Sequence, residues 1–200
     1  MNTLTVIKQR LVPYFLHRLQ EIGIPRPSYP DELMDAITVH YIPPGRRIEQ
    51  PTPCLFFLVH GLLKEYYRNG RSLYPSTLVQ LLQPDDIWLY NQSAHKFRTR
   101  TLMPSWILQI SMEQLHCIVR SPRKLRHWLV EQEMVYSAKH CLSDFIKQQP
   151  HWDDRIHLFL EEYGPYVDFL SNKEIHHYTG LDKTKIEKLR NKAFLYQRSE

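Results

Sequence analysis

Hydrophobic positions recur with a helical period at the start of the chain. Residues 3–22 carry apolar side chains every three or four positions, and this spacing predicts an amphipathic helix that Pro13 bends or interrupts. A second, short helix is expected to begin at the N-cap candidate Asp31. The apolar residues of the two helices are Ile7, Leu11, Phe15, Leu19 and Ile22, then Leu33, Met34 and Ile37.

From about Thr38 to Ser111 the pattern changes to short strand-like runs separated by glycine and proline. Val39 and Tyr41 alternate with His40, and Pro43-Pro44-Gly45 predicts a turn after them. Asn69-Gly70 is a strong signal for a tight hairpin. The later predicted strands are 55–59, 62–67, 77–82, 86–90, 98–102 and 106–110. Short strands at regular spacing predict a β-sandwich or barrel.

After Ser121-Pro122 the helical period returns and continues to Gln149, where Pro150 stops it. A helix of this length rises about 40 Å, which is longer than a small domain requires. Its apolar seam could pair with a second copy of the chain, pack on the β domain of its own chain, or do both. The seam residues are Leu125, Trp128, Gln132, Val135, Leu142 and Phe145. One more helix is expected over residues 153–169.

The stretch 170–192 contains two helix starts with a glycine between them. Ser171 and Glu174 form an S-x-x-E capping box, and Gly180 can adopt the left-handed conformation that ends a helix. Asp182 is the N-cap candidate of a second helix that buries Ile186 and Leu189 and has a basic outer face. This arrangement is typical of a helix-turn-helix. The alternative is an ordinary helical hairpin with a solvated lysine face.

Composition adds limits to this picture. The chain has 200 residues, 42% hydrophobic and 24% charged, with a net charge of +5 that is compatible with a polyanionic partner. Cys54, Cys117 and Cys141 are widely spaced, which argues against a disulfide framework or zinc ribbon and fits a reducing cytosol. No signal peptide or membrane-spanning run is recognised, so a soluble cytoplasmic protein is expected.

The order of these elements resembles the CRP/FNR family of bacterial transcription regulators, and three motifs support the resemblance. Residues 42–45 (Ile-Pro-Pro-Gly) look like the family's strand-end turn, residues 58–67 resemble its "l-x-x-G-x-v-k-x-y" strand pair, and residues 110–115 resemble its "I-s-x-e-x-l" segment before the long helix. The chain is most similar to short members that lack a β-wing, because only residues 193–200 follow the second helix.

The resemblance implies an α+β fold. Residues 1–121 would form an antiparallel, cyclic-nucleotide-binding-like β-roll with N-terminal helices, residues 122–149 a dimerisation helix, and residues 150–200 an all-α helix-turn-helix domain. The implied function is transcription regulation by a homodimer that binds double-stranded DNA at two half-sites. RNA polymerase is an implied partner, and the roll would take a small-molecule effector or act only as a scaffold.

The roll departs from the family pattern where members bind cyclic nucleotides. The family's Arg-Ser/Thr-Ala segment, which grips the phosphate, would fall near His95-Lys96-Phe97, and its Gly-Glu pair near Leu89-Tyr90. We therefore predict that cAMP does not bind with appreciable affinity and that no cofactor is present; clustered cysteines for an iron–sulfur centre are also absent. The candidate ligand-pocket residues are Tyr90, His95, Arg98 and Arg100.

The second helix of the helix-turn-helix departs from the family's "G-[ILV]-[ST]-x-E-T-[LV]-[SG]-R". Thr184 takes the position of the Glu and Lys188 that of the Arg, so a bidentate guanine pairing is not available, although a lysine can still donate to a base or phosphate. His176 replaces a small residue of the first helix. The predicted DNA-binding residues are Lys183, Thr184, Lys185, Lys188 and Lys192. The alternative is a dimeric interaction protein of the same fold that has lost sequence-specific DNA binding.

An enzyme is not expected. The chain has eleven histidines, but His40, His60 and His95 lie singly on different predicted strands, and adjacent His176 and His177 would point to different helix faces. No G-x-S-x-G nucleophile motif and no phosphate-binding glycine loop is found. A cupin-like metalloenzyme is a third class, which stoichiometric metal in the purified protein would reveal.

Overall fold

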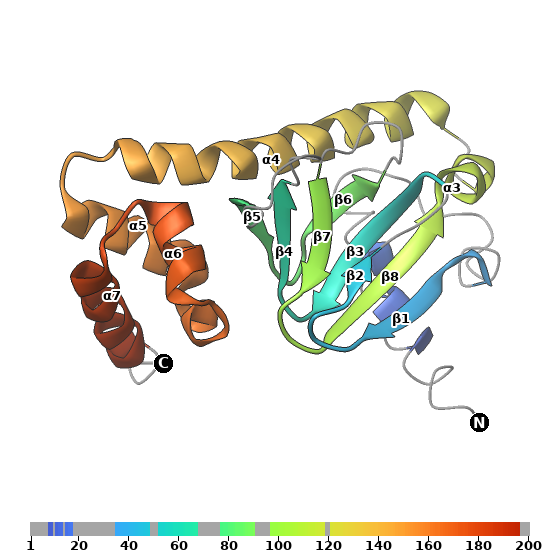
Figure 1. Cartoon of the computed structure of the whole chain (residues 1–200). Coiled ribbons are helices and arrows are strands. Elements are labelled where there is room, and N and C mark those ends of the chain that lie inside the picture. The colour runs from blue at the N-terminus through green and yellow to red at the C-terminus, as the bar shows by residue number, and fades with distance from the viewer. Residues whose placement is uncertain are drawn as a thin grey trace.

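The computed structural model describes residues 8–9, 11–13, 15–17, 35–48, 52–67, 77–90, 97–118 and 121–196. Within these ranges the strands come first and the long helices follow (Figure 1). The strands are β1 (Thr38–Ile42), β2 (Arg47–Ile48), β3 (Cys54–His60), β4 (Leu63–Tyr67), β5 (Thr77–Leu82), β6 (Ile87–Tyr90), β7 (Phe97–Thr101) and β8 (Ser105–Ser111). The helices are α3 (Met112–Ile118), α4 (Pro122–Gln148), α5 (Trp152–Tyr163), the 3-10 helix η2 (Gly164–Phe169), α6 (Asn172–Thr179) and α7 (Lys183–Tyr196).

The strands form two four-stranded antiparallel sheets. One has the order β1-β8-β3-β6 and the other the order β2-β7-β4-β5. Turns with glycine at positive φ redirect the chain, at Gly45 (φ 77°) and at Gly61 (φ 118°). A side chain at Gly61 would collide with the side chain and backbone of Ser105, so glycine is required there for close approach as well as for conformation. The predicted β-sandwich or barrel is thus a pair of antiparallel sheets.

The inward faces of the two sheets meet in an apolar core. Phe56 and Leu58 of β3 face Leu63 of β4 and Leu82 of β5, and Trp88 of β6 stacks on Phe56 with ring centroids 5.1 Å apart. Hydrophobic burial of this kind stabilises the sheet pair by about 25 cal/mol for each Å² removed from water. The middle of α4 closes this core, because Tyr136 packs against it.

The outer face of the first sheet is covered by helical segments from both ends of the strand region. Val12 and Phe15 of the N-terminal helical segment share a core with Leu55 and Phe57 of β3 and with the start of α4. Phe15 and Phe57 lie with ring centroids 5.4 Å apart. The remaining residues of the predicted 3–22 helix and the Asn69-Gly70 hairpin lie outside the described residues.

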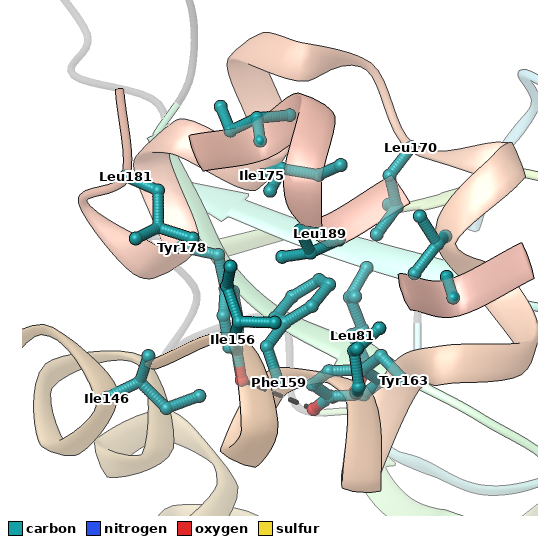
Figure 2. Packing of buried hydrophobic residues seen from close by; sticks show 14 of the residues in the cluster. Leu81, Ile146, Ile156, Phe159, Tyr163, Leu170, Ile175, Tyr178, Leu181 and Leu189 are labelled. Carbon is teal, nitrogen blue, oxygen red and sulfur yellow. Dashed lines mark hydrogen bonds between the residues drawn. The ribbon is translucent and has the colours of Figure 1, made fainter. Parts of the chain in front are cut away.

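The outer face of the second sheet packs against the C-terminal helices. Leu78 and Leu81 of β5 belong to the same buried cluster as Ile146 of α4, Phe159 of α5 and Leu189 of α7. Figure 2 shows Leu81 beside Tyr163. The hydroxyl groups of Tyr163 and Tyr178 are hydrogen-bonded to each other over 3.2 Å. The strand region and the C-terminal helices therefore share one continuous core.

Two element predictions need correction. The expected helix over 153–169 ends as an α-helix at Tyr163 and continues as the 3-10 helix η2, with Pro165 in its first turn. Strand β2 was not predicted, because two residues after a Pro-Pro-Gly turn are too few to show a period. The other strands and the long helix follow their predicted ranges within one or two residues. No described helix is long and apolar enough to cross a membrane.

Candidate nucleic-acid interface

Helix α6 begins with the predicted capping box. The backbone N of Glu174 donates to the Ser171 hydroxyl over 3.3 Å, and the backbone N of Ser171 donates to Oε2 of Glu174 over 2.8 Å. The other carboxylate oxygen, Oε1, accepts from Lys64 of β4. Burial alone raises the pKa of this carboxyl, but these donors outweigh it and hold the pKa below its usual value. Glu174 therefore fixes both the start of α6 and its position against the sheet.

The turn between α6 and α7 is tight and hydrogen-bonded. Gly180 adopts the left-handed conformation (φ 69°), and its N–H bonds back to the carbonyl of His176 over 2.8 Å. His176, where the family has a small residue, uses its ring: Nδ1 lies 2.7 Å from the Leu181 carbonyl oxygen. The Thr179 hydroxyl accepts from the backbone N of Leu181 over 3.2 Å. The imidazole ring of His176 therefore stabilises the turn by hydrogen bonding across it.

Helix α7 starts at the predicted N-cap. Asp182 accepts from the backbone N of Lys185 at 3.0 Å and from its Nζ at 2.7 Å. The hydrogen bond from the Lys185 side chain, followed by that from its backbone N, holds the pKa of Asp182 below its usual value. Ile186 and Leu189 are buried, as predicted, whereas Lys183 and Thr184 are exposed.

The two remaining predicted DNA-binding residues of α7, Lys188 and Lys192, are exposed but engaged with α5. Nζ of Lys188 lies over the Trp152 ring, 4.6 Å from its centroid, and Nζ of Lys192 is 2.8 Å from Oδ1 of Asp153. The basic face of α7 therefore borders the first turn of α5, which carries Trp152 and the acidic residues Asp153 and Asp154. Trp152 and Asp153 were not predicted, because the contact joins two helices that no local pattern relates.

Arg190 of α7 has a structural role. Its guanidinium donates to the carbonyls of Val167 (3.1 Å) and Leu170 (2.6 Å) and to the side chain of Asn172 (3.0 Å). The Val167 carbonyl also accepts from the backbone N of Leu170 over 3.2 Å, so Arg190 adds a second donor at the end of η2. Arg190 thus ties α7 to the segment before α6 and keeps the two helices in register.

The structure describes the side chains of only two candidate ligand-pocket residues, Arg98 and Arg100 of β7. Thr99 faces the inside of the sheet pair, where its hydroxyl donates to Glu65 over 3.1 Å, so its neighbours Arg98 and Arg100 point to the outer face. The two arginines therefore face away from the roll interior, and ligand binding by them remains a prediction. Tyr90 ends β6, but its side chain and His95 lie outside the described residues.

A buried carboxylate stands inside the roll instead. Glu65 of β4 accepts hydrogen bonds from Thr99, from Gln80 at 2.8 Å and from the Tyr136 hydroxyl of α4, and Nε2 of His140 lies 3.4 Å away. Burial alone raises the pKa of this carboxyl, but hydrogen bonds with His140, Tyr136 and Gln80 outweigh it, and the pKa is lowered. Strand alternation with Leu63 could have identified Glu65 as inward-facing.

The predicted seam of α4 divides into two faces. Leu125 and Trp128 are 0% and 1% exposed in the core of their own chain, and Leu142 packs against the C-terminal cluster. These residues are therefore not open to a second copy, while Gln132 is half-buried. Val135 is exposed although it lies seven residues from both Trp128 and Leu142, on the same stripe of the helix. The outward face of α4 carries the exposed residues Val130, Met134, Ala138, Cys141 and Phe145.

Among the described residues, no three His, Cys, Asp or Glu side chains gather where they could hold a metal ion. The hydrogen-bonded groups of the roll interior are Glu65, Gln80, Thr99 and Tyr136.

No family model matches the chain, and no curated protein matches its sequence. Solved structures do match. FixK2 from Bradyrhizobium japonicum aligns with a TM-score of 0.64 and 12% identity over 80% of this chain and 86% of that one. A cyclic nucleotide-binding domain containing protein from Listeria monocytogenes gives 0.60 and 14% over 90% and 89%. A crp/fnr-family transcriptional regulator from Eubacterium rectale gives 0.58 and 12% over 84% and 83%. Across most of its length, the chain has the fold of CRP/FNR family regulators.

Proposed function

We propose that the chain is a DNA-binding transcription regulator of the CRP/FNR type, in which α6 and α7 form a helix-turn-helix. The observation that carries this proposal is the exposed basic face of α7, held by a capped start and a left-handed turn, on a fold shared with such regulators. Lys183, Thr184, Lys185, Lys188 and Lys192 would face the duplex, with α7 in the major groove.

The proposed regulator acts as a homodimer through the outward face of α4. Met134, Ala138, Cys141 and Phe145 follow one another at spacings of four, three and four residues, which is the seam pattern of a two-helix coiled coil. Met134 is 67% and Phe145 52% exposed, so this apolar face is uncovered in the single chain. Two copies joined along it would present two α7 helices to two half-sites about one helical turn apart.

The proposed roll does not bind cAMP. Its interior is packed with apolar side chains around the Glu65 carboxylate, whose charge would repel a cyclic phosphate placed beside it. Hydrogen bonds from three elements already satisfy that carboxylate. The roll thus serves as a scaffold or takes an effector of another charge.

We also propose that the chain divides into three parts, residues 1–121, 122–149 and 150–200. Pro150 lies between α4 and α5, at the boundary of the last two parts.

The test is selection of bound sequences from a random duplex pool, followed by titration of the selected site against salt. We expect a two-fold-symmetric motif that Lys188→Ala binds more weakly. The salt dependence of the variant should be shallower by about 0.9 for each half-site, because one phosphate fewer is neutralised there. Sequence-blind binding, or none at low salt, would contradict the proposal. It would favour the dimeric interaction protein of the same fold, and a protein partner should then be sought.

A further inference from the structure

A row of cations crosses the outer face of the second sheet. In the sheet register, Arg47 of β2 lies opposite Arg100 of β7, and Arg100 lies opposite Lys64 of β4. These side chains share the outward face, because the intervening Glu65 and Thr99 bond to each other inside the roll. Arg98 points outward one pair further along β7. We call Lys64, Arg98, Arg100 and Arg47 the sheet row.

Two cations of the sheet row, Arg98 and Arg100, have no acidic partner among the described residues. Like charges directly opposite on neighbouring strands are destabilising. Lys64 has an acidic partner, Glu174, but among the described residues neither Arg98 nor Arg100 forms an ion pair or a side-chain hydrogen bond. Nε of Arg100 is buried and has no hydrogen-bond partner among them. Such an arrangement is costly in the isolated protein and is relieved when an anion approaches.

The sheet row is continuous with the proposed DNA-binding helices. Its first member, Lys64, contacts Glu174 in the first turn of α6, and the neighbouring strand β5 packs on the same helix through Leu78 and Leu81. Figure 1 shows α6 on the side of the C-terminal helices that faces β4 and β5. From this junction the row runs outward over β4, β7 and β2 to the edge of the sheet.

The dimensions of the sheet row suit a nucleic-acid backbone. Neighbouring strands lie about 4.8 Å apart, so three cations on successive strands span about 10 Å. One strand of a duplex carries a phosphate for about every 3.4 Å of helix axis, so two to three phosphates fit along this length. Arginine in particular pairs with phosphate through two parallel hydrogen bonds.

We propose that the sheet row binds the sugar-phosphate backbone of DNA that flanks the half-site read by α7. This inference rests on the proposed DNA binding and adds a second contact surface on the strand region. The surface is sequence-independent, because phosphates are the same at every base pair. Flanking DNA would lower the repulsion between Arg98 and Arg100 while extending the interface beyond the groove.

The experiment compares two duplexes that contain the selected site, one ending at the half-sites and one with flanks of about one to two helical turns on each side. Binding is followed by fluorescence anisotropy over a range of salt concentrations. The test variant is Arg98→Gln with Arg100→Gln. The charge-matched control is Arg123→Gln with Lys124→Gln, which removes two exposed cations at the start of α4.

We expect the wild-type protein to bind the flanked duplex several-fold more tightly than the short one, because added phosphate contacts strengthen binding. The test variant should lose that advantage, with a salt slope shallower by about 1.8 per subunit on the flanked duplex only. The control should retain it, and Arg98→Lys with Arg100→Lys should restore most of it. Unchanged affinity of the short duplex will show that the test variant is folded.

Two results would overturn the inference. If the test variant keeps the full advantage of the flanked duplex, the row does not touch flanking DNA and an acidic protein surface becomes its candidate partner. If the variant binds both duplexes more weakly by the same factor, the arginines stabilise the fold and do not contact flanking DNA. Failure of the wild-type protein to bind either duplex would instead refute the proposed function, and this inference with it.

Discussion

The hydroxyl of Tyr136 on α4 donates a hydrogen bond to the carboxylate of Glu65 on β4, inside the strand region. Tyr136 therefore connects the long helix to the interior of the roll at a point where both groups are largely hidden from water. Burial, together with the neighbouring Glu65 charge, raises the pKa of Tyr136, so the phenol remains a proton donor over the whole physiological range.

Replacing Tyr136 by Phe should destabilise the protein by about 1.5–3 kcal/mol, because a buried carboxylate loses one of its donors while the ring volume is kept. Denaturant unfolding monitored by circular dichroism will measure the change. Tyr41→Phe is the matched control, since Tyr41 is 51% exposed. Equal effects of the two substitutions would mean that the bond to Glu65 contributes nothing particular.

The stability contributed by Glu65 should depend on pH. Its folded-state pKa lies below the unfolded value of about 4.3, so the contribution is complete above that value and is lost as the pH falls through the folded pKa. The amide of Glu65→Gln cannot titrate. The difference in unfolding free energy between wild type and Glu65→Gln should therefore be constant well above the unfolded pKa of about 4.3 and shrink as the pH falls below it. A difference that stays constant through this range would show that the pKa of Glu65 is the same in the folded and unfolded protein.

Asp153 should weaken DNA binding, because its carboxylate competes with phosphate for Lys192. Asp153→Asn is expected to raise affinity for the selected duplex about two- to fivefold, the range that corresponds to an exposed ion pair. Asp154→Asn removes the same charge from the same helical turn and serves as the matched control, with a smaller expected effect. If both variants gain the same DNA affinity, the gain comes from the change in net charge and not from the ion pair with Lys192.

Trp152 should strengthen DNA binding by holding Lys188 in place through its ring. Trp152→Leu keeps an apolar side chain in the partly buried position and should lower affinity about two- to fivefold, as expected for a partly exposed cation–π interaction. In a Lys188→Ala background the same change should have little further effect. If Trp152→Leu lowers the DNA affinity by the same factor in that background, Trp152 does not act through Lys188.

Cys141 reports on the proposed dimer. If the outward face of α4 pairs with its own copy in parallel, Cys141 meets Cys141 within the Cα separation of about 4.4–6.8 Å that disulfides typically span. Mild oxidation should then give a covalent dimer that Cys117→Ser retains and Cys141→Ser abolishes, since both cysteines are exposed. Met134→Glu with Val135→Glu should give monomers by light scattering. A dimer that survives these substitutions must use another face.

The sequence predicted those features that depend on neighbouring residues. The capping box of Ser171 and Glu174 and the left-handed Gly180 are local devices, and the structure has both. The two faces of α4 could not be assigned in this way. Trp128 and Val135 lie seven residues apart on the same predicted seam, and only the positions of the sheets decide that the first is buried and the second exposed.

The sequence alone also could not decide which face of each strand points into the roll. Alternation places Thr99 opposite to Arg98 and Arg100, but it does not say which face is inside until the partner Glu65 is located. Interactions between distant helices, such as Lys188 with Trp152, carry no local signal at all. Part of the candidate surface thus followed from α7 alone, whereas its extension onto α5 and the sheet required the fold.

The core shared by β5 and the C-terminal helices makes their attachment sensitive to temperature. Separating them would bring Leu78 and Leu81 into contact with water, and hydration of apolar surface raises the heat capacity. Because hydrophobic interactions weaken on cooling, the attachment of α6 and α7 to the sheet would loosen in the cold and tighten with moderate warming. The position of α6 and α7 against the sheet would then depend on temperature.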